Sequence, residues 1–138
     1  MNQFLIVLLF SFSPGMQQKT PPTENGFIGT WHGASICVDC KLDAACKDEE
    51  VVYVVKGIHA VQDTVEMEAY KIVDGERVSM GVMRPGYSRG SDVWAFELAA
   101  RVHALWTFQV KDSTVSGTLV ELPSKRLIRA VHVSRFME

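Results

Sequence analysis

Three cysteines and five acidic residues share one short stretch of the chain. Cys37, Cys40 and Cys46 fall within residues 35–50, whose sequence is SICVDCKLDAACKDEE. A Cys-x-x-Cys spacing can belong to a zinc site, to a redox pair or to a disulfide. Each of these chemistries needs different neighbours, so the surrounding sequence must distinguish them.

Metal and redox chemistry both lack the neighbours that they require. A structural zinc site uses four ligands, usually in two spaced pairs, and the chain has no second Cys-x-x-Cys. His32 is five residues before Cys37 on the same predicted strand, so the two side chains point to opposite faces. A redox Cys-x-x-Cys normally opens a helix that follows a strand, which is not the context here. We therefore expect no metal and no cofactor.

A disulfide is the remaining chemistry. Cys37 ends the first predicted strand, and Cys46 lies just before the second. The two strands are hairpin neighbours, so these positions face each other at the base of the loop, as a disulfide requires. We predict a Cys37–Cys46 disulfide, with Cys40–Cys46 as the alternative. With the first pairing, Cys40 is an odd thiol, either free or paired between molecules.

An oxidising compartment fits the N-terminal sequence. Residues 4–12 read FLIVLLFSF, an apolar run too short to span a bilayer but typical of a signal-peptide core. Ser13 and Gly15 are small residues at the spacing that signal peptidase reads. We predict a signal peptide (1–15), a disordered lead-in (16–26) and one β-barrel domain (27–138), in a periplasmic or secreted protein. The alternative is that the apolar run is a buried strand.

Charge argues against one class of partner. The formal net charge is −2, and the Lys and Arg residues are scattered along the chain. Nucleic-acid binding requires a concentrated basic face. We therefore expect no nucleic-acid partner, and no membrane span once the signal peptide is removed.

Short strands broken by turn residues at roughly ten-residue spacing indicate an all-β fold. No segment carries a sustained helical period, so no substantial helix is expected apart from the signal peptide. An eight-stranded antiparallel up-and-down barrel would leave no exposed sheet edge, and a sandwich is the alternative. The eight predicted strands are 28–37, 49–57, 63–73, 76–83, 92–99, 104–111, 114–122 and 126–135.

The turn at Asp74-Gly75 favours a tight hairpin, because both central residues must adopt positive φ. Counting back from this turn pairs Ala69 with Met80 and Met67 with Val82. These side chains would share the apolar face that points into the barrel.

A second tight hairpin is predicted at Asp112-Ser113. It pairs Phe108 with Gly117 and Trp106 with Leu119. A ring can lie over a residue that has no side chain, so Phe108 opposite Gly117 is physically reasonable.

The direction of the side chains on the last strand depends on the turn before it. A three-residue turn at 123–125 places Leu127, Arg129 and Val131 inside the barrel. A two-residue turn would place Ile128 and Ala130 inside instead. The larger number of apolar side chains favours the three-residue turn.

Connections alternate between the two ends of such a barrel, so the cysteine loop should lie at the end opposite the chain's entry. Its acidic rim is either simply solvated or selects a cationic ligand. Apolar and aromatic walls suit an apolar ligand or a filled core equally well. The residues that we expect to line a pocket are Met67, Met80, Trp94, Phe96, Trp106 and Phe108.

Residues 29–31 read Gly-Thr-Trp, and a Gly-x-Trp on the first strand resembles the calycin superfamily of lipocalins and avidins. The resemblance implies that Trp31 plugs the barrel floor and that a basic residue of a late strand covers it. We place Arg129 in that role, with Arg135 as the alternative. The resemblance also implies that the opposite end, under the cysteine loop, is the open mouth.

A resemblance over nearly the whole domain rests on three strings. GTWHGASIC…CKDEEVVYVV, ALWTFQV and GTLVELPSKRLIR together resemble a family of small secreted bacterial proteins of unknown function. The resemblance implies that Cys37 and Cys46 are the matching cysteines and that Cys40 is an addition. It implies no activity.

No motif fixes a nucleophile beside a base, and the histidines are not clustered, so we do not expect an enzyme. The first hypothesis is an exported carrier of a small apolar ligand. The second is a protein-binding or inhibitor-like module of the cell envelope that acts through its loops. The candidate contact residues for the second are Arg84, Tyr87 and Arg89 in the RPGYSRGS loop (84–91), because Tyr and Arg dominate interface hot spots. The sequence leaves the oligomeric state open.

Overall fold

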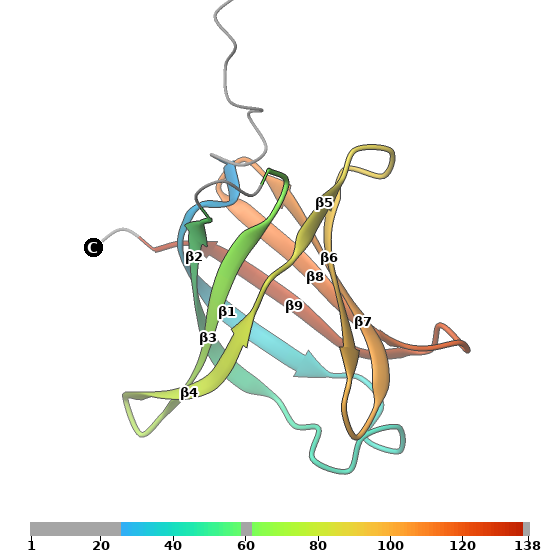
Figure 1. Ribbon diagram of the computed structural model, residues 1–138. Coiled ribbons are helices and arrows are strands. Elements are labelled where there is room, and N and C mark those ends of the chain that lie inside the picture. The colour runs from blue at the N-terminus through green and yellow to red at the C-terminus, as the bar shows by residue number, and fades with distance from the viewer. Residues whose placement is uncertain (1–25, 59–61, 137–138) are drawn as a thin grey trace, which may run out of the picture.

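The computed structural model describes residues 26–58 and 62–136. The predicted signal peptide (1–15) and almost all of the predicted lead-in (16–26) lie outside these residues. The described residues form an all-β fold (Figure 1). Its strands are β1 (Gly29–Cys37), β2 (Glu49–Gly57), β3 (Val65–Val73), β4 (Glu76–Met83), β5 (Gly86–Ser88), β6 (Val93–Ala99), β7 (His103–Lys111), β8 (Thr114–Glu121) and β9 (Leu127–Arg135).

All nine strands belong to one antiparallel sheet that curls into a half-barrel. Their order is β4-β3-β2-β1-β9-β8-β7-β6-β5. The eight predicted strands correspond to β1–β4 and β6–β9. The additional strand, β5, lies inside the loop predicted at 84–91. A closed eight-stranded barrel is not confirmed, because β4 and β6 do not pair with each other.

The two edges of the sheet meet at only one end. There the chain passes from β4 to β5 across the start of β3: Val65 N donates to Pro85 O (3.1 Å), and Tyr87 N donates to Asp63 O (2.7 Å). At the other end β4 leaves the barrel wall (Figure 1), and both Val78 and Met80 are 41% exposed. The half-barrel therefore has a closed end and an open end, which we call the mouth.

An aromatic cluster fills the closed end. Phe27, which precedes β1, packs against Trp94 and Phe108 with ring centroids 5.3 and 6.0 Å away, and its carbonyl accepts the indole N–H of Trp31 (2.9 Å). These four side chains are 0–2% exposed. The interior at this end is therefore a packed hydrophobic core.

The predicted hairpin at Asp112-Ser113 is confirmed. Phe108 pairs with Gly117 and Trp106 pairs with Leu119, as the two-residue turn requires. A Cβ added at Gly117 would lie 2.8 Å from the Phe108 ring. The glycine is therefore needed for the close approach of that ring.

The register predicted from Asp74-Gly75 is correct only next to the turn. A β-bulge follows the Tyr70–Ser79 pair, so Ala69 pairs with Gly81 and Met67 pairs with Met83. The extra residue reverses the direction of the side chains that follow, which turns Val82 outward (59% exposed). Gly81 has φ = 112°, a conformation that favours glycine.

A second bulge, at Ile128, combines the two alternatives for the last strand. Leu119 pairs with Arg129, but Val120 pairs with Leu127. Arg129 is therefore turned inward, as the three-residue turn predicts, whereas Leu127 is 37% exposed. Ile128 is buried under the cysteine loop, where its carbonyl accepts Val38 N (2.8 Å) and Asp39 N (3.1 Å).

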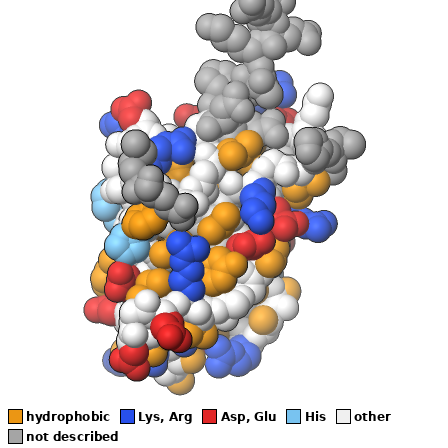
Figure 2. All heavy atoms as spheres, turned by 90° about the vertical axis from the view of Figure 1, so that its left-hand side faces the viewer, with side chains coloured by type: hydrophobic (Ala, Val, Ile, Leu, Met, Phe, Trp, Pro, Cys, Tyr) orange, Lys and Arg blue, Asp and Glu red, His pale blue; other side chains and the backbone are white. Residues whose placement is uncertain are grey.

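The outer face carries mixed charges. Figure 2 shows basic, acidic and hydrophobic side chains interspersed over the side of the sheet that faces the viewer. Ion pairs such as Lys56–Glu68 (3.2 Å) and His32–Glu50 (2.7 Å) account for part of this pattern. This is the usual composition of the solvated face of an antiparallel sheet. Within residues 26–58 and 62–136, no helix is long and apolar enough to cross a membrane.

Candidate ligand-binding site at the mouth

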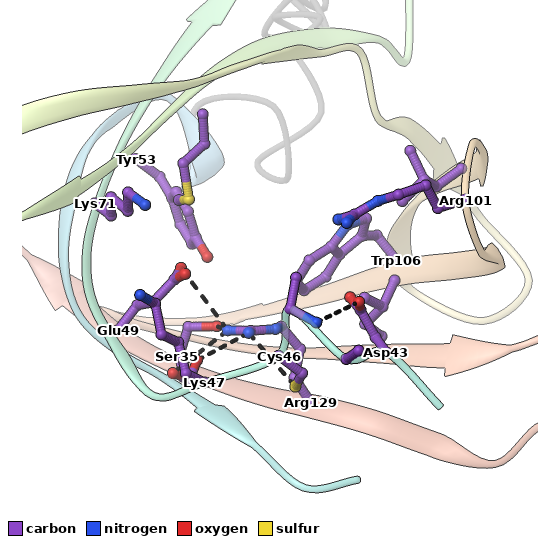
Figure 3. Close-up of a pocket in the computed structure, with 15 residues that line it drawn as sticks. Ser35, Asp43, Cys46, Lys47, Glu49, Tyr53, Lys71, Arg101, Trp106 and Arg129 are labelled. Atoms are coloured by element: carbon purple, nitrogen blue, oxygen red, sulfur yellow. Dashed lines mark hydrogen bonds and ion pairs between the residues drawn. The ribbon is translucent and has the colours of Figure 1, made fainter. Parts of the chain in front are cut away.

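The mouth contains a pocket of about 650 Å³ (Figure 3). It lies between the curled sheet, the β1–β2 connection and the β6–β7 connection. Its lining residues are Ser35, Asp43, Ala44, Ala45, Cys46, Lys47, Glu49, Tyr53, Lys71, Met80, Leu98, Arg101, Trp106, Leu119 and Arg129.

The cysteine loop forms one wall of the pocket. The Cys37–Cys46 disulfide closes this loop, with Cα atoms 5.5 Å apart, which confirms the predicted pairing. The loop is further fixed by Asp48, whose carboxylate accepts Cys37 N (2.8 Å), and by Asp43, which accepts Ala45 N (3.1 Å). Cys40 is exposed and carries a free thiol. The disulfide and these hydrogen bonds therefore position residues 43–47 against the pocket.

Arg129 joins the loop to the sheet at the bottom of the pocket. Its guanidinium donates to Ser35 Oγ on β1, to Lys47 O (3.0 Å) and to Cys46 Sγ (3.6 Å). The Glu49 carboxylate lies 4.0 Å away and provides the opposite charge. Arg129 is only 9% exposed, so these contacts replace the water that a buried cation loses. The guanidinium thus holds the floor of the pocket together.

Tyr53 extends from β2 toward the same floor. Burial is the main reason why the pKa of its phenol is raised above the ordinary value, and the negative charge of Glu49 adds to this effect. The positive charge of Arg129 and a hydrogen bond with Ser35 act in the opposite direction but do not cancel it. Tyr53 therefore remains a neutral hydroxyl that can donate or accept a hydrogen bond in the pocket.

The sides of the pocket are apolar. Trp106 stacks on Phe108, with centroids 5.4 Å apart and ring planes 9° from parallel. Because Phe108 lies in the core of the closed end, the opposite face of the Trp106 ring is turned toward the mouth. Leu98 on β6, Leu119 on β8 and Met80 on β4 are further apolar side chains of the lining. A polar floor with apolar sides is the usual composition of a small-molecule site.

The charge of the pocket differs from that predicted for the rim. Of the acids in the cysteine loop, Asp39 pairs outward with Arg126 (3.1 Å), Asp48 is used by the loop backbone, and Glu50 pairs with His32 on the outer face. These outward contacts agree with the first alternative, a solvated rim, and the pocket lining does not favour a cation-selecting entrance. Its lining has four basic residues and two acidic ones, namely Lys47, Lys71, Arg101, Arg129, Asp43 and Glu49.

Two of the six predicted pocket residues line the pocket, and four do not. Trp106 and Met80 line the pocket. Met67, Trp94 and Phe108 are fully buried core residues, because Phe27 fills the closed end beside them. Phe96 is half-buried on β6 and does not line the pocket.

Arg135, and not Arg129, covers Trp31 at the closed end. The Arg135 guanidinium carbon lies 4.5 Å from the centre of the Trp31 ring, and the group donates to Ile28 O (3.0 Å) and Gly26 O (2.7 Å). Trp31 pairs with Arg135 across β1 and β9, whereas Arg129 pairs with Cys37 at the opposite end of the same ladder. Placing Arg129 over Trp31 was therefore wrong.

The three predicted contact residues of the 84–91 loop bind within the chain. Arg84 pairs with Glu66 (3.3 Å) and Arg89 pairs with Asp63 (3.3 Å). Tyr87 donates to Asp92 (2.5 Å), and its ring packs on Trp94. These contacts fix the strand that crosses from β4 to β6, so the loop has a structural role. An interaction with an envelope protein through this loop stays a prediction.

Several pocket residues were not singled out by the sequence reasoning. Lys71 lies on β3 two residues after Ala69, so both side chains point to the inward face. A charged residue on an otherwise apolar face was the feature of the sequence that could have identified Lys71 as a pocket residue. Ser35 and Glu49 become site residues only through their contacts with Arg129. In the part of the chain that the structure describes, no group of three His, Cys, Asp or Glu side chains is placed to hold a metal ion.

No protein-family model matches the chain, and no curated protein matches it. The function must therefore be argued from the pocket.

Proposed function

We propose that this chain is an exported binding protein that holds a small molecule in the mouth pocket. The observation that carries the proposal is the pocket of about 650 Å³, with Trp106 and Leu98 on its sides and Arg129 and Tyr53 at its floor. This volume is within the range of known small-molecule sites, roughly 300–1,000 Å³. The sequence predicts an apolar ligand. Because the floor of the pocket offers hydrogen-bonding groups, we propose an amphipathic ligand instead.

Two features support export and a calycin-like origin. The Cys37–Cys46 disulfide is consistent with an oxidising compartment and agrees with the signal peptide expected at 1–15. Trp31 at the closed end, covered by Arg135, matches the arrangement that the calycin resemblance implies. We infer that the half-barrel is a calycin-type barrel whose wall is open between β4 and β6.

Native mass spectrometry of the protein purified from its own host, without detergent, tests the proposal. We expect a bound small molecule that is lost in Trp106→Ala, which removes one side of the pocket. The control Phe136→Ala changes an exposed aromatic residue outside the pocket and should retain the adduct. A bare chain mass, together with no fluorescence gain from the neutral dye N-phenyl-1-naphthylamine, would contradict the proposal.

A further inference from the structure

Three cations of the pocket have no carboxylate partner among the described residues. Lys47, Lys71 and Arg101 line the pocket, yet none of them makes an ion pair with any residue in 26–58 or 62–136. The fourth cation, Arg129, is already neutralised by Glu49. Asp43 also lines the pocket without a cation partner among these residues, so the open part of the pocket carries an excess of positive over negative charge.

These cations approach the pocket from different elements. Lys71 belongs to β3, Arg101 to the β6–β7 connection, and Lys47 to the end of the cysteine loop. Figure 3 shows Lys71 and Arg101 on opposite sides of the pocket, with their charged ends turned toward its middle. A ligand between them would meet N–H donors from both sides, an arrangement that suits a carboxylate.

The apolar side indicates the shape of the rest of the ligand. One face of Trp106 is covered by the parallel ring of Phe108, and the other face is turned toward the mouth. Aromatic rings prefer offset stacking on such a face. Leu98 lines the pocket from the neighbouring strand β6, so a flat group stacked on Trp106 also has an aliphatic side chain beside it.

We propose that the pocket selects small aromatic carboxylates, with the ring on Trp106 and the carboxylate between Lys71 and Arg101. The inference rests on the proposed function, because it specifies the ligand of the same pocket. The cations would discriminate against amines and would leave neutral analogues with the stacking contact alone.

Isothermal titration calorimetry with three compounds of similar shape tests the charge preference. Indole-3-acetate, indole-3-acetamide and tryptamine share the ring and differ in charge. We expect the acid to bind about tenfold more tightly than the amide, because hydrogen bonds to a charged group are the stronger ones. Tryptamine should bind most weakly. Equal affinities, or no binding by any of the three, would overturn the inference, whereas the proposed function is contradicted only by the native mass and dye results described above.

Variants identify the residues responsible. Lys71→Gln and Arg101→Gln should each weaken binding of indole-3-acetate about five- to tenfold and leave indole-3-acetamide unchanged. The matched control is Lys111→Gln, an exposed cation at the turn between β7 and β8 near the closed end, which should change neither affinity. A loss of similar size for both ligands in the pocket variants would contradict the proposed position of the carboxylate.

A final arm tests the stacking contact. Acetate carries the carboxylate without the ring, so at equal concentration it should not displace indole-3-acetate. Displacement would overturn the part of the inference that assigns the ring to Trp106.

Discussion

Arg129 shows how one side chain can hold a binding site together. It contacts a serine of β1, two residues of the cysteine loop and the Glu49 carboxylate. A hydrophobic replacement would remove all of these bonds at once and leave Glu49 half-buried without its counter-charge. The floor of the pocket therefore depends on this guanidinium more than on any neighbouring charge.

Arg129→Met should lower the free energy of unfolding by about 2–4 kcal/mol, because a buried charge network loses one partner. Arg129→Lys should recover only part of the loss, since one ammonium group cannot reach both Ser35 and Lys47 O. The measurement is urea unfolding followed by circular dichroism. Arg126→Met is the control: its ion pair with Asp39 is exposed and should contribute less than about 1 kcal/mol. Equal losses in Arg129→Met and Arg126→Met would contradict this role.

Tyr53 predicts a response to alkaline pH. Burial raises its pKa above the ordinary value of 10.0, so the unfolded chain releases this proton at a lower pH than the folded one. The stability that the neutral phenol contributes is complete below about pH 10 and is lost as the pH rises further. Wild-type protein should therefore unfold in alkali more readily than Tyr53→Phe, as measured by circular dichroism against pH. Identical alkaline transitions would show that Tyr53 ionises freely in the fold.

Some residue roles could be predicted from the sequence, and others depended on contacts that it does not show. The Cys37–Cys46 pairing followed from the position of each cysteine at the end of a strand. The choice of Arg129 over Arg135 was wrong, although the antiparallel pairing of first and last strands could have corrected it. Trp31 is near the start of its strand and must face the end of the last one. Phe27 was unpredictable, because it precedes the first strand and nothing local fixes its direction.

At the scale of elements, the disulfide-closed loop acts as a wall of the pocket. Replacing both Cys37 and Cys46 with Ser should destabilise the fold by about 2–3 kcal/mol, as expected for a closed loop of about ten residues. It should also weaken binding of indole-3-acetate several-fold, because residues 43–47 are no longer held in place. Calorimetry and urea unfolding provide the two measurements.

The free cysteine offers the control for this experiment. Cys40→Ser removes an exposed thiol and should change neither the stability nor the affinity. Unchanged ligand affinity in the double variant would show that the loop does not shape the pocket.

Bulges mark the limit of sequence reasoning about the elements. The hairpin at Asp112-Ser113 was predictable because its two-residue turn sets an uninterrupted register. The hairpin at Asp74-Gly75 has an equally clear turn, but a bulge before Gly81 shifts everything beyond it. A single inserted residue reverses every later side chain, so a correct turn did not give a correct apolar face for β4.

At the scale of the whole molecule, the open wall between β4 and β6 distinguishes this fold from a closed barrel. Backbone amides along 76–82 should exchange with deuterium much faster than those of β1, β8 and β9, which have paired strands on both sides. Hydrogen exchange followed by mass spectrometry measures this difference. Comparable protection of β4 and β1 would indicate that the wall is closed in solution.

The number and order of the long strands could be predicted from the sequence. Closure of the barrel could not, because it depends on how β4 bends.

The central claim is that the mouth, and not the closed end, binds a small molecule. The three tryptophans report on both places: Trp106 lines the pocket, whereas Trp31 and Trp94 are buried in the closed end. Titration with indole-3-acetate, followed through the three indole N–H signals in ¹H–¹⁵N NMR spectra, tests the claim most directly. The Trp106 signal should shift progressively to saturation while those of Trp31 and Trp94 stay in place. A static Trp106 signal, or equal shifts of all three, would contradict a binding site at the mouth.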